Sequence, residues 1–404
     1  MTTTERLTAS SDKPAAPTLR QRLSQLTDSG GATGAGYAQV VVGVVLLWTL
    51  FTILNPRFIS PLNLTNLSLQ IVTLSVMAIG VCLVLLLGEI DLSVGSVSGL
   101  AATVAAYLNV VLGVPAPIAF LAAAATGCGV GLLQGAIIVG FGVPSFVVTL
   151  GGLIGWQGVQ LLFFSFTGAM IFTDPQVLGL TTTFFPPIAG WALAIGAMVV
   201  LTGLGVRSRA QRAKAGLSNP PAWTITVRLG VIAALLAIAI LVFSADRGIP
   251  LGVLIVFGLI IVVDFLVRRT TTGRHIYAVG GDRVAAERVG INVAGISVLV
   301  FSACGFFAAI AGILSASRLQ SVTQSAGSGD LLLNAIAAVV IGGTSLFGGR
   351  GSIWSALLGA LVIGSISNGM DLLGLESPVK LMVTGVVLIS AVVFDATMRR
   401  RAAR

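Results

Sequence analysis

Charged residues are scarce in this chain. Asp, Glu, Lys and Arg together make up 9% of its 404 residues, against about 25% in an ordinary soluble domain. Hydrophobic residues make up 56%, so the polar surface is too small to cover a water-soluble body of this size. The apolar runs are long and continuous rather than alternating, which excludes a membrane β-barrel. The sequence predicts an all-α polytopic membrane protein.

Residue types that build catalytic and metal centres are equally scarce. The single histidine is His275, and the three cysteines Cys82, Cys128 and Cys304 lie inside apolar segments without metal-ligand spacing. No lysine follows a glycine-rich phosphate loop, so a Walker A motif is missing from the sequence. We therefore expect no catalytic residue, no metal site and no cofactor. Any use of ATP would require another chain.

About twelve apolar runs approach or exceed the length of a membrane span, roughly 20 residues. We expect some of them to be broken or re-entrant rather than straight spans. The runs lie at 38–54, 67–88, 93–112, 116–140, 144–166, 187–206, 228–245, 250–267, 294–316, 331–348, 352–371 and 378–397. Together they predict a single transmembrane domain over 37–398, between a disordered cytoplasmic tail at 1–36 and a basic tail at 399–404.

The net charge of +9 is distributed unevenly along the chain. Basic residues gather in the breaks at 207–227 and 268–293 and in the tail at 399–404. Because cytoplasmic loops carry an excess of Lys and Arg, these segments are predicted to be cytoplasmic, and twelve crossings then put both termini there. Membrane topology accounts for the charge, so nucleic acid is not expected as a partner. The proline-containing outside loop 167–186 is predicted to be an ordered cap. Whether this loop contacts an external partner or only connects two helices remains open.

The polar stretch 268–293 is the most informative break in the chain. We predict a turn followed by a short helix, in which Asp282 caps the N-terminus and Gly290 ends the helix in a left-handed conformation. Two helical turns, over Arg283–Val289, are too short to be stable alone in water. The helix therefore needs a partner surface to dock against.

Two acidic residues follow the second apolar run with almost no polar loop around them. A charge at the bilayer centre costs about 2.5–3.5 kcal/mol on insertion scales, so Glu89 and Asp91 need a special environment. One interpretation is a broken helix along a polar path, with Glu89, Asp91, Ser93 and Ser96 offering oxygens to a polar solute. The other is a tight interfacial turn in which Asp91 caps the next helix. Both remain open.

A glycine-rich stretch at 342–351 also interrupts an apolar run. Its glycines disfavour a regular helix, and broken backbone at membrane depth must be buried or line water. With Asn334, Thr344 and Ser345 it predicts a discontinuous helix at a solute path or at a subunit contact. Elsewhere, Gln134, Gln157 and Asn368 lie inside apolar runs. Hydrogen bonding between helices is expected for them, with a sugar-binding role open for one.

Several stretches resemble the carbohydrate ABC importer permeases of the ribose, xylose and galactose branch. Arg274-His-Ile-Tyr-Ala-Val-Gly-Gly-Asp-Arg-Val-Ala-Ala-Glu-Arg-Val-Gly-Ile-Asn-Val is similar to their cytoplasmic loop. The resemblance extends over roughly 40–400 and includes Glu89-Ile-Asp-Leu-Ser-Val-Gly-Ser, Val143-Pro-Ser-Phe-Val-Val-Thr-Leu, Ile336-Ala-Ala-Val-Val-Ile-Gly-Gly-Thr-Ser and Asn368-Gly-Met-Asp-Leu-Leu-Gly. The additional helix pair at 187–245 is similar to the xylose-type permeases.

The resemblance implies the membrane permease subunit of an ATP-driven pentose importer, with xylose favoured, in the bacterial inner membrane. It implies a cytoplasmic ABC ATPase, an extracytoplasmic sugar-binding protein and a second permease copy as partners, with membrane lipids around them. The expected ATPase-coupling residues are Gly273, Arg274, Tyr277, Gly280, Gly281, Asp282, Ala285, Ala286 and Gly290. The expected substrate-path residues are Glu89, Asp91, Ser93, Ser96, Asn334, Thr344 and Ser345.

Two alternatives stay open. The cargo could be another sugar, a polyol or a signalling furanose, because a separate binding protein usually sets the specificity. The chain could instead be an ion-coupled secondary transporter that uses Glu89 and Asp91 as its ion site.

Overall fold

Helices make up most of the computed structural model, which describes residues 31–164, 168–219, 221–328 and 330–402. Within these residues nine helices are long and apolar enough to cross a membrane, and three further helices carry shorter apolar stretches. The long ones are α3 (Pro61–Leu86), α4 (Val94–Ala106) with its π-helical continuation to Val111, α5 (Ala116–Phe141), α6 (Ser145–Leu162), α8 (Pro187–Lys214), α9 (Ala222–Ser244), α10 (Leu251–Arg269), α13 (Val293–Leu319) and α15 (Ile353–Leu372). The others are α2 (Gly31–Leu54), α14 (Asp330–Ile341) and α16 (Ser377–Ala402). The prediction of about twelve segments is confirmed.

The ends of the predicted domain differ from the structure. Helix α2 begins at Gly31, before the predicted domain start at residue 37, so residues 31–36 are helical rather than part of a tail. Residues 1–30 lie outside the described residues. Helix α16 continues to Ala402, into the segment predicted as a separate basic tail.

The core of the bundle is formed around α3 and α13. In the most apolar 18-residue stretch of each helix, 89% of the residues are buried in α3 and 67% in α13. Helix α13 packs closely on α5, because a Cβ added at Gly127 or at Gly305 would overlap the carbonyl oxygen of the other glycine. Small residues at such a contact let two backbones approach, as in other packed membrane helices.

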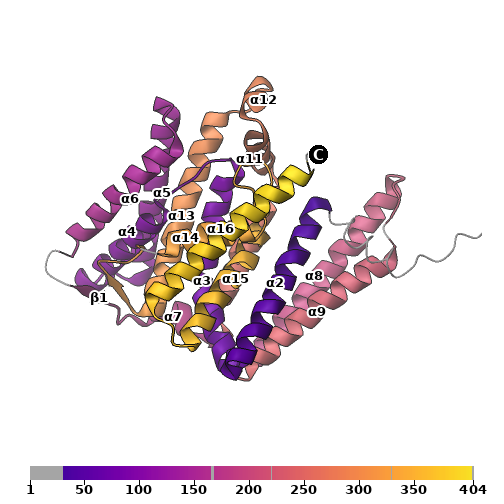
Figure 1. Cartoon of the computed structure of the whole chain (residues 1–404), viewed down its shortest axis with the longest axis horizontal. Helices are drawn as coiled ribbons and strands as arrows, with labels where there is room; N and C mark the ends of the chain where they lie inside the picture. Colours follow the sequence, from indigo (N-terminus) through magenta and orange to yellow (C-terminus); the bar gives the residue numbers. More distant parts are fainter. Residues whose placement is uncertain (1–30, 165–167, 220, 329, 403–404) are drawn as a thin grey trace, which may run out of the picture.

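Short strands and one helix cover one end of the bundle. Strand β1 (Ala169–Ile171) pairs antiparallel with β4 (Ser321–Thr323), and β2 (Phe184–Phe185) pairs with β3 (Ile249–Pro250). Helix α7 (Pro175–Thr182) lies between β1 and β2 in the chain. The predicted ordered cap over 167–186 is confirmed from residue 168 onward; residue 167 lies outside the described residues. We call this end of the molecule the strand end (Figure 1).

Two helices that do not cross the membrane lie at the opposite end. They are α11 (Thr271–Gly281) and α12 (Arg283–Arg288), and the C-terminal end of α16 points to the same side (Figure 1). We call this the α12 end. The predicted turn before α12 is wrong, because α11 is a regular helix of 11 residues.

Candidate functional site

Helix α12 is an exposed helix with the predicted caps. The Oδ1 atom of Asp282 accepts a hydrogen bond from the Ala285 N–H at 2.9 Å, and Gly290 follows the helix with a φ of +83°. Ala286 is buried beneath the helix, whereas the side chains of Val284 and Val289 are 58% and 76% exposed. Val284 lies in this helix of six residues, and Val289 is the residue that follows it as the C-cap.

Helix α11 forms in spite of its glycines because these glycines permit close packing. The Thr270 hydroxyl caps the helix by accepting a hydrogen bond from the Gly273 N–H at 3.2 Å. A Cβ at Gly273 would overlap the backbone of Val267, and a Cβ at Gly280 would overlap the carbonyl oxygen of Leu86. Both glycines are therefore packing residues. Gly281, one position further, has open space around it.

The other two coupling candidates of α11 differ in exposure. Arg274 is exposed, whereas Tyr277 is half-buried. The Tyr277 hydroxyl donates a hydrogen bond to the Gly351 carbonyl oxygen at 2.9 Å. Tyr277 thereby fixes α11 to the glycine-rich segment that follows α14.

That glycine-rich segment, 342–352, packs between α11 and the end of α3. The Gly349 N–H donates a hydrogen bond to the Leu86 carbonyl oxygen at 3.0 Å. A Cβ at Gly348 would lie 2.6 Å from the Gly280 oxygen and 2.8 Å from the Gly88 nitrogen. Three backbone segments thus meet at the α12 end, and glycine is required where they touch.

Glu89 lies beside α12. Its Oε1 atom is 3.1 Å from a guanidinium nitrogen of Arg283, and the two side chains are 22% and 47% exposed. A half-exposed pair of this kind contributes about 1 kcal/mol or less. Its importance is positional, because it connects the segment after α3 directly to α12.

Asp91 is buried two residues further along. Its Oδ1 atom accepts hydrogen bonds from the Ser93 N–H at 2.8 Å and from the Ser93 hydroxyl at 2.6 Å. Burial raises the pKa of the Asp91 carboxyl, and the hydrogen bonds from Ser93 oppose that shift. The interpretation of Asp91 as the cap of α4 is wrong, because Ser93 occupies the N-cap position and makes no side-chain cap bond. Asp91 instead holds the turn that precedes the cap.

A cavity of about 340 Å³ lies between α4, α6, the start of α14 and the segment that precedes α14. Ser96 and Gln157 supply polar side chains to its wall, and Ala326–Ser328 supply backbone. Gln160 is fully buried, and its Nε2 donates to the Ala326 carbonyl oxygen at 3.1 Å. The wall therefore combines hydrogen-bonding groups with apolar side chains.

The backbone break beside this cavity falls in the gap between the predicted apolar runs 294–316 and 331–348, but its packing against α4 was not predicted. Gly327, with a φ of +74°, packs against Gly95 and Gly99 of α4 so closely that a Cβ at any of the three would overlap backbone of the facing segment. Helix α14 has 12 residues and so spans about 18 Å, less than the roughly 30 Å of a bilayer core. The contact of Gly327 with Gly95 and Gly99 joins segments far apart in the sequence, so no local pattern in 324–328 could have predicted it.

The predicted substrate-path residues fall into two groups. Ser96 lines the cavity, and Ser93 lies one turn before it, with its hydroxyl 3.0 Å from the Oε1 atom of Gln134. Thr344 and Ser345 are buried in the glycine-rich segment at the α12 end, and the Thr344 hydroxyl is 2.8 Å from that of Ser355. They do not line the cavity.

Asn334 lies on α14, one residue past the cavity wall. Its Oδ1 atom is buried without a hydrogen-bond partner among the described residues. Of the amides inside apolar runs, Asn368 accepts a hydrogen bond from the Asn63 amide of α3 at 2.9 Å, which confirms its role between helices. Gln157 is the amide that lies at the cavity.

Comparisons with known proteins identify the family. Residues 63–392 match the family described as branched-chain amino acid transport system / permease component. The chain is 34% identical over 361 residues to the xylose transport system permease protein XylH of Escherichia coli (strain K12), covering 89% of this chain and 91% of that protein. It is 33% identical over 379 residues to XylH of Haemophilus influenzae, covering 90% and 96%. It is 32% identical over 355 residues to the ribose import permease protein RbsC of Escherichia coli (strain K12), covering 88% and 92%.

No solved structure matches the chain. The relatives are membrane subunits of ABC transporters and are not themselves enzymes, and an importer of this class implies an ATPase and a binding protein as partners. With its apolar spans, the chain is a multi-pass protein of the inner membrane. It belongs to the branched-chain amino acid transport system / permease component family, in the branch of ABC sugar permeases that contains these xylose and ribose proteins.

Proposed function

We propose that this chain forms the membrane pathway of an ATP-driven pentose importer, with D-xylose as the cargo. The observation that carries the proposal is the short covalent link between two sites. Segment 87–93 begins beside α12, where Glu89 pairs with Arg283, and leads into the first turn of α4, where Ser96 faces the cavity. Only six residues lie between the paired carboxylate of Glu89 and Ser96 at the cavity wall.

Helix α12 is the proposed contact with the ATPase. Val284, Ala285 and Val289 are exposed on it, and Asp282 and Gly290 define its ends. Movement of α12 by an ATPase cleft would carry α11 with it, because the two helices are joined by a single residue. Gly280 of α11 touches the end of α3, and Tyr277 bonds to the segment after α14. Such a packed contact transmits displacement because interiors are not continuously deformable.

The cavity is the proposed resting place of the sugar during transit. Ser96 and Gln157 offer a hydroxyl and an amide to sugar hydroxyls. Asn334 is proposed to join them when α14 moves, because its buried Oδ1 atom lacks a partner in the present conformation. Asp91 and Ser93 position the start of α4, and Glu89, Thr344 and Ser345 act at the coupling side rather than on the sugar.

The orientation follows from charge. With the α12 end in the cytoplasm, the basic segments 207–214 and 268–269 lie inside, as membrane proteins require. The strand end then faces outside, where the sugar-binding protein would dock near the exposed Ile171. Two copies of the chain per complex, one for each ATPase, complete the proposed importer.

The identities of 34% to a xylose permease and 32% to a ribose permease barely separate the two sugars. The proposal of xylose as the cargo therefore rests on the helix pair at 187–245, which resembles that of xylose-type permeases. The test is ATP hydrolysis by the chain reconstituted in vesicles with its ATPase and binding protein. Xylose should stimulate hydrolysis and accumulate inside, and ribose should do so weakly. Stimulation by ribose alone would assign another pentose. Uptake driven by an ion gradient without the ATPase would overturn the importer and favour the ion-coupled alternative.

A further inference from the structure

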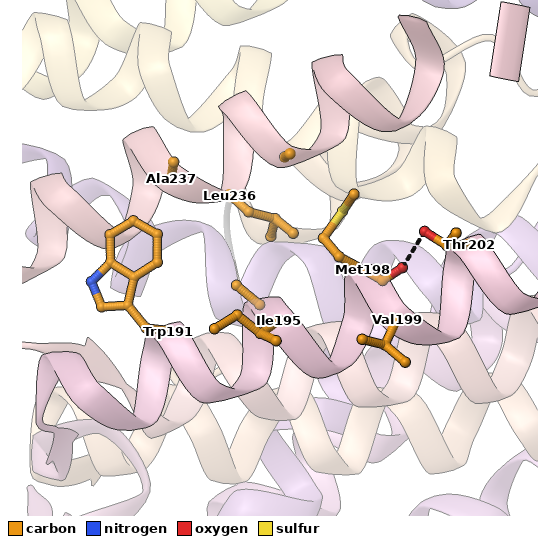
Figure 2. Close-up of a pocket in the computed structure, with 9 residues that line it drawn as sticks. Trp191, Ile195, Met198, Val199, Thr202, Leu236 and Ala237 are labelled. Atoms are coloured by element: carbon orange, nitrogen blue, oxygen red, sulfur yellow. Dashed lines mark hydrogen bonds between the residues drawn. The ribbon is translucent and has the colours of Figure 1, made fainter. Parts of the chain in front are cut away.

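The helix pair α8–α9 carries an apolar groove that packing within the chain leaves open. The groove has a volume of about 490 Å³ and includes Trp191, Ile195, Met198 and Thr202 of α8 with Leu236 and Ala237 of α9 in its wall. The side chains of Trp191, Met198 and Leu236 lie between the two helices (Figure 2). The Thr202 hydroxyl donates to the Met198 carbonyl oxygen at 2.7 Å, so the one polar side chain in the wall is satisfied within its own helix.

The two helices make few contacts with the rest of the bundle. In the most apolar 18-residue stretch of each helix, only 6% of the residues are buried inside the chain. The pair lies at the edge of the molecule (Figure 1). Some other molecule must therefore cover the groove in a membrane, and its chemistry can be read from what the groove leads to.

The groove leads to a basic helix end. The face formed by Ile195, Met198 and Thr202 continues, in steps of three and four residues, through Gly205 to Arg209 and Arg212. Helix α8 has 28 residues, about 42 Å, so its last turns project beyond a bilayer core of roughly 30 Å. Lys214 ends the helix. The Arg212 guanidinium donates hydrogen bonds to the Ser218 carbonyl oxygen at 3.1 and 3.3 Å, and because that carbonyl is neutral the positive charge of Arg212 remains.

We propose that the α8–α9 groove binds an anionic phospholipid of the leaflet at the α12 end. One acyl chain lies in the groove, and the phosphate contacts Arg209 and Arg212 at the point where α8 leaves the membrane. The groove wall ends at Thr202, about 10 Å along α8 before Arg209, so an acyl chain in the groove and a phosphate at the basic helix end match the two parts of such a lipid. A zwitterionic lipid would fill the groove equally well but would lack the charge that this end of the helix selects.

The experiment measures lipid selectivity of the purified full-length chain. The protein is exchanged into mixed micelles that contain equal amounts of phosphatidylglycerol and phosphatidylcholine, and the retained lipids are quantified by mass spectrometry. Wild-type protein should retain phosphatidylglycerol in excess, by about fivefold for each arginine that contacts the phosphate. The double variant Arg209→Gln/Arg212→Gln should lose the preference, and Arg57→Gln at the opposite end should keep it.

Filling the groove tests the acyl part independently. Met198→Trp/Ala233→Trp should lower the amount of bound lipid, whereas Leu235→Trp, an exposed position on α9 outside the groove wall, should not. Equal retention of the two lipids by wild-type protein would overturn the proposal. So would a groove-filling variant that changes the oligomeric mass but not the lipid content, because that result would assign the groove to a second copy of the chain.

Discussion

Helix α14 separates two breaks in which glycine permits close backbone packing, and the two breaks have different neighbours in the structure. The break before it, 324–328, packs on α4 and lines the cavity. The break after it, 342–352, packs on α11 and on the end of α3 at the α12 end. In both breaks glycine permits backbone contact. What differs is the neighbour, which is a cavity wall for one and the candidate coupling loop for the other.

The largest effect is expected at Gly280, where the second break touches α11. A Cβ there would overlap the Leu86 oxygen and lie 2.7 Å from the Gly349 nitrogen, all backbone atoms that cannot move aside cheaply. Gly280→Val should destabilise the protein by about 3 kcal/mol or more. The measurement is the loss of monodisperse protein on heating in detergent. Gly281→Val, whose Cβ meets open space, is the matched control, and equal loss in both would refute the packing role.

Gly99 provides the corresponding change at the first break. Its Cβ would overlap the Ala326 oxygen and lie 2.6 Å from Oε1 of Gln160. Gly99→Ala should displace the cavity wall at a cost of about 1–3 kcal/mol. Sugar transport should fall further than basal ATP hydrolysis in the reconstituted complex. Gly158→Ala on α6, with nothing near its Cβ, should leave both activities unchanged.

Side chains sharpen the comparison further. Ser96→Ala and Gln157→Leu should each raise the KM for sugar about fivefold, the equivalent of one lost hydrogen bond of about 1 kcal/mol. Gln157→Leu should not lower thermal stability, whereas Ser96→Ala also removes the hydrogen bond that its hydroxyl donates to the Ser93 carbonyl oxygen at 2.9 Å. Thr344→Val should instead lower thermal stability and leave the KM for sugar unchanged, because the Thr344 hydroxyl in the second break is hydrogen-bonded to the Ser355 hydroxyl of α15. A KM effect at Thr344 and none at Ser96 would reverse the assignment of the two breaks.

The smallest effect is expected at the Glu89–Arg283 pair, which is half-exposed. Glu89→Gln should change the free energy of unfolding by less than about 1 kcal/mol. Coupling between sugar binding and ATP hydrolysis should fall modestly and recover in the charge-exchanged variant Glu89→Arg/Arg283→Glu. If the exchanged variant restores no coupling, the ion pair is not part of the contact that links α12 to the cavity.

The sequence predicted the helical membrane fold well because hydropathy and length determine spans directly. Asp282 and Gly290 were also correct, since helix caps depend on a few local atoms. Helix α11 was missed because the glycines at 273 and 280 argue locally against a helix; their packing against Val267 and Leu86 is a tertiary contact.

The candidate site was predicted only in part for the same reason. Ser96 lies at the cavity wall, and its role on the substrate path stays a prediction. Gln160 was overlooked because nothing local distinguishes a buried glutamine that bonds to Ala326 from one that faces lipid. The glycine-rich stretch with Thr344 and Ser345 was predicted to lie at a solute path or at a subunit contact, and both interpretations stay predictions. The contacts of Gly348 with Gly280 and Gly88 show that its glycines permit close backbone packing, which depends on tertiary neighbours that the sequence does not reveal.

The central claim is that α12 couples an ATPase to the cavity, and one substitution addresses it most directly. Ala285 is exposed on α12, so Ala285→Trp should leave the chain folded while blocking its seat on the ATPase. We predict that sugar-stimulated ATP hydrolysis is lost in the reconstituted complex, whereas Ala213→Trp, an exposed position near the end of α8, behaves as wild type. Full stimulation in the Ala285→Trp complex would contradict the account.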